Sequence, residues 1–148
     1  MIKVQRASLG STLYTSLFKV TLNNKTGIAM IYTSYYARAR SFPNFVHIRV
    51  STSSPKWYPF NTECLPELYP GFNLVNDLKT GRITEEEYTR KYEEKLSHLV
   101  KTKILHKISE LSNGKDALLL CYEKEGDFCH RHIVAKWLDA GIKELPKP

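Results

Sequence analysis

The chain has 148 residues, 42% of them hydrophobic and 25% charged, and its formal net charge is +7. This is the composition of a globular protein, and the length fits a single domain, residues 1–148, whose core needs no disulfide or metal. No apolar run approaches the roughly 18 to 20 residues that cross a bilayer, and residues 1–20 lack the apolar stretch of a secretory signal. We therefore expect a cytoplasmic protein with no membrane partner. Its positive charge favours anionic partners such as a nucleotide or nucleic acid.

The N-terminal part of the chain predicts one strand clearly. Residues 12–20 are expected to form a first strand or helix, and residues 23–27 supply turn chemistry. Residues 27–34, "GIAMIYTS", are a short apolar run that begins at a glycine and ends in small polar residues. This pattern is typical of a buried strand.

A second strand is expected at residues 45–51, "FVHIRVS". Its alternation places His47 and Arg49 on one face, where they are expected to be solvated or to line a site. The following stretch, residues 51–76, is rich in Pro, Ser, Tyr and Asn. It is expected to be a long irregular excursion, and such loops are usually functional or mobile.

Residues 80–114 give the clearest helical pattern. Thr84 and Glu87 have the spacing of a capping box, and apolar residues then recur every three or four positions. Asn113 and Gly114 end the pattern. The spacing fits one long helix or two helices in tandem.

The C-terminal third predicts a strand, a helix and a last short strand. Residues 117–121 are five consecutive apolar residues, which indicates a strand buried on both faces in the middle of a parallel sheet. Residues 133–138 have helical spacing, and residues 142–145 can add an edge strand. We therefore expect a small α/β, Rossmann-like domain with a mostly parallel sheet flanked by helices. Ligands bind such sheets at the strand carboxyl ends, where residues 32–36 and 121–131 would both lie.

The 121–131 stretch carries the strongest chemical signal. If Asp127 is the N-cap of the last helix, Cys129 and His130 lie in its first turn and Arg131 points outward. Unpaired N–H groups and partial positive charge at a helix N-terminus stabilise a thiolate, and they also bind phosphate. The catalytic candidates are therefore Cys129, with His130 or Glu123 as proton carrier, and Arg131 is the candidate anion ligand. The spacing leaves open whether the site presents a nucleophile or holds an anion.

Plainer interpretations of the same residues stay open. Cys121, at the end of an apolar run, is most simply a buried core residue, and Glu123 can be a solvated carboxylate. The three cysteines do not form a disulfide scaffold. The two cysteines of this stretch are eight positions apart rather than in a Cys-x-x-Cys knuckle, so neither a zinc site nor any other cofactor is predicted.

The 32–40 stretch, "YTSYYARAR", is the second concentration of polar and aromatic residues. Tyr32, Thr33 and Tyr35 are expected to form the wall opposite Cys129, with Ser34 also binding the ligand. Arg38 would neutralise phosphate, and tyrosine rings can stack on a base. An exposed surface with free arginines would give the same pattern.

Both stretches together resemble the uncharacterised bacterial and phage family catalogued as domain of unknown function 488. The resemblance is carried by "IYTSY" at residues 31–35, "LLCYE" at residues 119–123 and "CHR" at residues 129–131, followed by an apolar helix. The chain departs from the family pattern at Ser34, where glycine is common. The resemblance implies an α/β domain whose two motifs meet in one pocket, and it favours an enzyme.

Three hypotheses about function follow. The first is an enzyme that acts on a nucleotide or nucleic acid. The second is a binding module for the same ligands without catalysis, whose affinity would fall with salt. The third is a phage-type inhibitor of a host protein that binds its target through the aromatic loop at residues 55–72.

Overall fold

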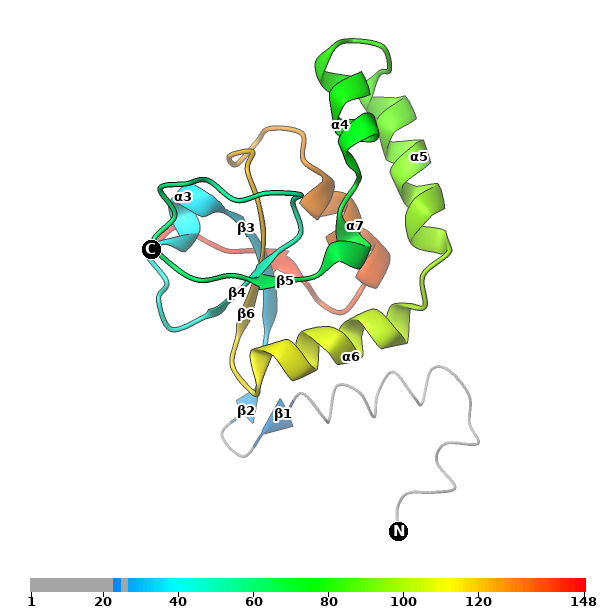
Figure 1. Cartoon of the computed structure of the whole chain (residues 1–148). Helices are drawn as coiled ribbons and strands as arrows, with labels where there is room; N and C mark the ends of the chain where they lie inside the picture. Colours follow the sequence, from blue (N-terminus) through cyan, green and yellow to red (C-terminus); the bar gives the residue numbers. More distant parts are fainter. Residues whose placement is uncertain (1–22, 25–26) are drawn as a thin grey trace, which may run out of the picture.

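A computed structural model of the chain describes residues 23–24 and 27–148 (Figure 1). The element expected at residues 12–20 lies outside the described residues. The elements are β1 (Asn23–Asn24), β2 (Gly27–Ile28), β3 (Ile31–Tyr35), α3 (Tyr36–Ala39), β4 (Val46–Arg49), β5 (Glu63–Cys64), a 3-10 turn η1 (Pro66–Leu68), α4 (Phe72–Lys79), α5 (Glu85–Ser97), α6 (Lys101–Ser112), β6 (Ala117–Cys121), α7 (His130–Leu138) and β7 (Lys143–Glu144).

The central sheet has five strands in the order β5-β4-β6-β3-β7, and every neighbouring pair is parallel. The predicted α/β class with a mostly parallel sheet is confirmed. The apolar strand β6 lies in the middle, with Tyr35 of β3 beside Cys121 at its end. Because the strands are parallel, their carboxyl ends share one edge, the upper edge in Figure 1. The two motifs at residues 31–35 and 119–123 therefore end side by side.

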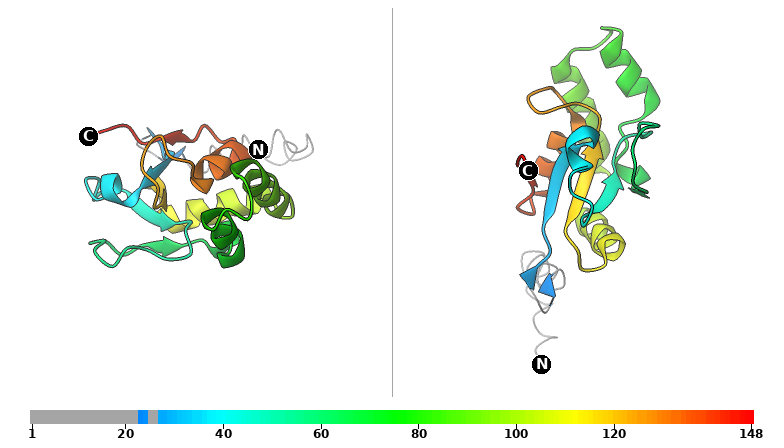
Figure 2. Two further views of the ribbon diagram at one scale, coloured as in Figure 1. Left: turned by 90° about the horizontal axis from the view of Figure 1, so that it is seen from above. Right: turned by 90° about the vertical axis from the view of Figure 1, so that its left-hand side faces the viewer.

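The two faces of the sheet are covered unequally (Figure 2). Helices α5, α6 and α7 pack on one face and form the larger core, around residues such as Leu119, Ile108 and Val134. On the other face, α3 and neighbouring loops cover a smaller core around Leu118 and Leu120. Within the described part of the chain, no helix is both long and apolar enough to cross a bilayer.

The helical pattern of residues 80–114 forms two helices in tandem rather than one. The Thr84 hydroxyl accepts a hydrogen bond of 3.1 Å from the backbone N–H of Glu87, as the capping-box spacing predicts. The chain turns at residues 98–100, and Asn113 ends α6 in a left-handed conformation.

The 51–76 stretch was expected to be irregular, and this is wrong in part. The stretch contains β5, η1 and the beginning of α4. Helix α4 lacks the usual sequence signals, because its N-cap is Gly71 and no side chain caps its first turn. It forms a hairpin with α5 that rises above the carboxyl edge of the sheet (Figure 1).

His47 is neither solvated nor part of the pocket described below, so the expectation from strand alternation is wrong for this residue. Its side chain is 4% exposed and lies in the smaller core. One ring nitrogen bonds the Phe42 carbonyl at 2.9 Å, and the other bonds the Tyr58 hydroxyl at 2.5 Å. His47 therefore anchors the 51–62 loop against the sheet.

The Thr84 cap gives a prediction about stability. Thr84→Ala should lower the free energy of unfolding by about 1 kcal/mol, because it leaves an N–H at the start of α5 without its partner. The matched control is Thr89→Ala inside the same helix, where the hydroxyl only bonds the Glu85 carbonyl. Alanine is the better helix former there, so stability should hold or rise slightly in urea denaturation. Equal losses at both positions would contradict the capping role.

Candidate functional site

A pocket of about 1170 Å³ opens at the carboxyl edge of the sheet. Its floor is made by the end of β6 and the start of α7, where Cys121, Cys129 and His130 line the cavity. Residues 51–53, which follow β4, form one wall. Helix α4 and the beginning of α5 form the opposite wall. The pocket therefore lies where a parallel sheet is expected to bind its ligand.

The two thiols and the imidazole at the floor form one compact cluster. The Cys121 and Cys129 sulfurs and a nitrogen of His130 all lie within 4.8 Å of one another. All three residues are almost fully buried, with exposures of 2%, 3% and 6%. The cluster could act as a nucleophilic centre or hold a metal ion.

The protonation of His130 follows from its neighbours. Its Nε2 lies 2.8 Å from the Val50 carbonyl oxygen, which can only accept a hydrogen bond. Nε2 therefore carries the proton, and in the neutral ring Nδ1 has a free lone pair. Nδ1 lies 3.4 Å from the Cys121 sulfur. The basic nitrogen thus faces the thiols.

The thiolate of the cluster is stabilised at Cys129. Burial raises the pKa of this thiol, but a hydrogen bond from Cys121, a hydrogen bond and positive charge from the His130 ring in its protonated form, and the positive charge of Arg131 outweigh burial and lower it. The pKa of Cys121 is raised, first by its hydrogen bond to Cys129 and then by its own burial. Of the two thiols, Cys129 is therefore the one that loses its proton, and Cys121 keeps its proton.

The position of Cys129 at the start of α7 helps to stabilise its thiolate, but Cys129 lies earlier in the helix than predicted. The N-cap of α7 is Cys129 itself, not Asp127, which lies in the preceding turn. The Cys129 sulfur thus lies at the positive end of a helix of nine residues. Helix N-termini of this kind lower the pKa of a thiol.

Glu123 lies beside the thiols and lines the pocket. One of its carboxyl oxygens is 3.4 Å from the Cys121 sulfur. Burial raises the pKa of this carboxyl, and the charge of Cys129 raises it further. Glu123 is therefore suited to carry a proton next to a thiolate.

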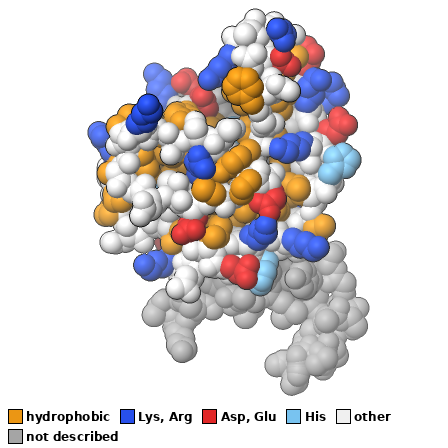
Figure 3. Space-filling view, viewed as in Figure 1, with side chains coloured by type: hydrophobic (Ala, Val, Ile, Leu, Met, Phe, Trp, Pro, Cys, Tyr) orange, Lys and Arg blue, Asp and Glu red, His pale blue; other side chains and the backbone are white. Residues whose placement is uncertain are grey.

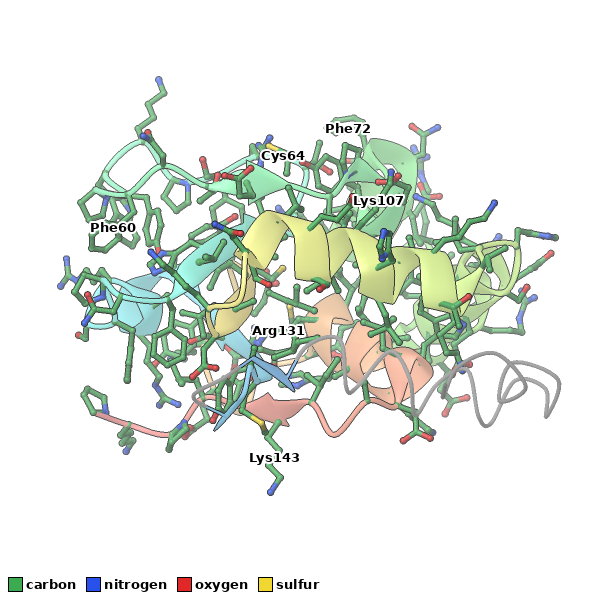
Figure 4. The ribbon with its side chains drawn as sticks, turned by 90° about the horizontal axis from the view of Figure 1, so that it is seen from below. Phe60, Cys64, Phe72, Lys107, Arg131 and Lys143 are labelled. Atoms are coloured by element: carbon green, nitrogen blue, oxygen red, sulfur yellow. The ribbon has the colours of Figure 1, made fainter. Side chains whose placement is uncertain are left out.

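Arg131 does not point outward from the helix, which corrects that expectation. Its side chain is 0% exposed, and it lies near the middle of the molecule in Figure 4. Its Nε and Nη2 donate to the two carboxylate oxygens of Glu144 at 3.2 and 2.9 Å, and Nη1 donates to the Glu123 carbonyl at 2.5 Å. The guanidinium does not line the pocket. It holds β7 and the 122–129 loop in place from below.

The 32–38 residues do not form the wall opposite Cys129. None of Tyr32, Thr33, Ser34, Tyr35 and Arg38 lines the pocket. Thr33 is buried and donates to Glu144 at 2.6 Å, and Ser34 is fully buried. Thr33 therefore supports the carboxylate that pairs with the buried guanidinium, whereas the Ser34 hydroxyl donates to the Tyr35 carbonyl at 3.5 Å.

Arg38, Tyr35 and Tyr32 also contact other parts of the protein rather than the pocket. Arg38 is 8% exposed, donates to the Leu145 carbonyl at 2.9 Å and pairs with Glu125 at 2.8 Å. The guanidinium groups of Arg38 and Arg131 lie 5.1 and 5.8 Å from the ring centre of Tyr35. Tyr32 packs against Phe45.

Sequence reasoning missed the actual opposite wall. It is made largely by apolar side chains of α4 and α5, among them Phe72, Leu78 and Tyr88. Ser51, Thr52 and Ser53 were also missed. These three residues follow β4, and the residues after every strand of a parallel sheet reach the same carboxyl edge. The rule that placed residues 32–36 and 121–131 at that edge therefore predicts residues 51–53 there as well. Nothing in the sequence indicates that α4 folds back over that edge.

The buried Arg131–Glu144 pair yields a prediction. Glu144→Gln should lower the free energy of unfolding by about 2–3 kcal/mol, because it leaves the guanidinium without its counter-charge. Partial exposure of Glu144 keeps this below the cost of breaking a fully buried pair. The control Glu125→Gln removes the half-exposed partner of Arg38 and should change stability little. Urea denaturation measures both, and equal effects would contradict the assignment.

The pKa values of the two thiols can be tested by alkylation. In a Cys64→Ser background, iodoacetamide should modify Cys129 at a rate that changes little between about pH 6 and about pH 9, because its lowered pKa leaves it ionised throughout. An ordinary thiol with a pKa of about 8.5 slows roughly tenfold for each pH unit below that value. Cys121 should remain unmodified. A tenfold dependence at Cys129 would contradict the thiolate.

Residues 31–141, about three quarters of the chain, match the family model described as DUF488-N3a, the active DUF488-N3 subclade. No curated protein and no solved structure matches the chain. The matched segment contains both motifs, the whole central sheet except β7, and the pocket floor. The chain therefore belongs to the DUF488 family, in its N3a subclade.

Proposed function

We propose that this protein is an enzyme that acts on a nucleotide or nucleic-acid substrate through a covalent step at the Cys129 sulfur. One observation carries the proposal: the Cys129 sulfur at the start of a helix, with the Glu123 carboxyl group nearby whose pKa burial raises, forms the floor of an open pocket. A nucleophile next to a proton carrier is the arrangement that covalent catalysis requires.

The charges around the pocket determine how such a substrate would enter. Glu123, Glu85 and Asp127 line the pocket together with the Cys129 thiolate, and among its lining residues Lys79 is the one lysine or arginine. On the face seen in Figure 3, basic side chains are scattered among acidic and apolar ones. A phosphate group would be repelled from the floor, so we expect the base to enter first and the phosphate to remain at the rim.

Aromatic side chains support this orientation. Phe72, Tyr88, Tyr122 and Phe128 all line the pocket, and Phe72 is 75% exposed. Stacking on such rings is worth roughly 1–3 kcal/mol per base and tolerates any base. The Ser53 and Tyr122 hydroxyls, bonded to each other at 2.9 Å, provide polar groups in the same pocket.

Cys129 and Glu123 together supply the electron pair and the proton that the proposed step needs. The Cys129 sulfur forms a bond to an electrophilic ring carbon, and the electron pair of the ring double bond moves to the adjacent ring atom. That atom takes the proton of the Glu123 carboxyl, which becomes a carboxylate. Arg131 would not touch the substrate, but its charge would help to hold the sulfur in the reactive form. Both thiols must be reduced, which fits the expected cytoplasmic location.

A partner-binding role is the second candidate, and exposed aromatic groups favour it. Trp57 is 54% exposed, and Phe72 also faces solvent. Tyr58 and Phe60 of the same loop pack against His47. A phage-type inhibitor would therefore bind its target mainly through Trp57, and Trp57→Ala would remove its effect while Cys129→Ser would not.

The enzyme hypothesis can be tested with nucleosides, nucleotides and short single-stranded oligonucleotides, followed by intact-mass analysis of protein and ligand. We expect a covalent adduct on Cys129 and a changed ligand with one of these classes. Cys129→Ser should abolish both, and Glu123→Gln should slow turnover by about 10²- to 10⁴-fold. The control Cys64→Ser, which changes an exposed cysteine outside the pocket, should behave as the parent chain.

Two results would count against the enzyme. If a ligand binds with strongly salt-dependent affinity but is recovered unchanged, the protein is a binding module. If turnover survives in a folded Cys129→Ser variant, the sulfur is not the nucleophile. Thermal denaturation of each variant separates loss of chemistry from loss of folding.

A further inference from the structure

We infer that Cys121, Cys129 and His130 form a three-ligand site for a divalent metal ion of the Zn²⁺ class. The sequence spacing argues against a zinc knuckle, in which the ligands are close in the chain. The fold provides the ligands differently, because the end of a central strand and the start of the next helix meet at one point.

The distance between the Cys121 sulfur and His130 Nδ1 agrees with tetrahedral coordination. Bonds of about 2.3 Å to sulfur and 2.1 Å to nitrogen require a sulfur–nitrogen separation of about 3.6 Å. The Cys121 sulfur and His130 Nδ1 are 3.4 Å apart, and all three ligand atoms lie within 4.8 Å of one another. Small movements of side chains are enough to close the site around an ion.

The orientation of His130 is the second observation. Its Nε2–H donates to the Val50 carbonyl, which turns the lone pair of Nδ1 toward the two sulfurs. Histidine ligands of metals almost always donate their other N–H to a carbonyl or carboxylate in this way. The ring of Tyr92 packs edge-on against the imidazole at 5.5 Å and fixes it further.

The charges near the cluster permit a metal ion. Two thiolates neutralise a divalent cation, and the proton of the Cys121 thiol is released to solvent when its sulfur binds. The nearby cation, Arg131, is already paired with Glu144. Sulfur and imidazole ligands favour Zn²⁺ over Mg²⁺ or Ca²⁺, which prefer oxygen.

The site has an entry path and room for a fourth ligand. All three ligands line the pocket, so an ion can enter from solvent. Glu123, 3.4 Å from the Cys121 sulfur, can complete the coordination, or water can do so. Three protein ligands with one open position leave the fourth ligand exchangeable.

Metal binding has a consequence for turnover, and this part rests on the proposed function. An ion bound to the Cys129 sulfur occupies the electron pair that would attack the substrate. Zn²⁺ would then be a reversible inhibitor of the covalent step, and its removal would restore the nucleophile.

Cobalt titration of the reduced, chelator-treated full chain tests the binding itself. We expect one equivalent of Co²⁺ to produce the visible bands of a tetrahedral ion and near-ultraviolet sulfur-to-cobalt absorption, both displaced by Zn²⁺. Cys121→Ser and His130→Ala should each weaken binding by roughly tenfold or more. Cys64→Ser should bind cobalt as the parent chain does. Altered visible bands in Glu123→Gln would show that Glu123 is the fourth ligand, and unchanged bands would show that water is. Absence of these bands in the parent chain, or their survival in folded Cys121→Ser, would overturn the site.

A second measurement needs no substitution in the site. Zn²⁺ should protect Cys129 of the Cys64→Ser chain from iodoacetamide, and a chelator should restore the reaction. Unchanged labelling in the presence of excess Zn²⁺ would also overturn the proposal. These readouts do not require turnover, so a metal site without catalysis and catalysis without a metal site give different results.

Discussion

The buried guanidinium of Arg131 is the constraint on which the pocket depends. It joins β7 through both oxygens of Glu144, the 122–129 loop through the Glu123 carbonyl, and β3 through Thr33, which shares the same carboxylate. Burying an unpaired guanidinium would cost several kcal/mol, so these partners cannot move independently. The loop that carries Glu123 and leads into Cys129 is thereby fixed relative to the sheet. The position of the site is thus held by an ion pair that lies outside the pocket lining.

The same guanidinium explains why the floor of the pocket can hold negative charge although its thiols are almost fully buried. A thiolate in an apolar cavity would normally take up a proton, because burial favours the neutral form. Here the start of α7, His130 and Arg131 together offset that cost at Cys129, whereas Cys121 stays protonated. The net charge of +7 favoured anionic partners, but it says nothing about where the positive groups lie. At the pocket Arg131 lies beneath the floor, and among the lining residues Lys79 is accompanied by three acidic side chains, those of Glu85, Glu123 and Asp127.

Much of the fold could be predicted because its strongest signals are local. The apolar run of residues 117–121 had only one reasonable place, the centre of a parallel sheet, and the Thr84 cap marked the start of α5. Helix α4 could not be predicted in the same way. It has no capping side chain and follows a stretch rich in Pro and Tyr, so its position is fixed by packing against α5 rather than by its own sequence. That packing creates the wall of the pocket that sequence reasoning placed on β3.

The predicted catalytic residues Glu123, Cys129 and His130 do lie together, because the carboxyl-end rule for parallel strands needs only the strand and the following helix. Most of the predicted ligand-binding residues are polar yet buried, among them Thr33, Ser34 and Arg131, so polarity alone does not indicate exposure here. The helical spacing of α7 predicts that Arg131 is buried. Counting back from the buried Val134 by three and by four residues reaches Arg131 and His130, so both belong to the buried face of α7. A charged residue on the apolar face of a helix requires a buried counter-charge, and Glu144 on the edge strand provides it. An arginine at such a position is therefore better interpreted as support for a reactive group than as a ligand for the substrate.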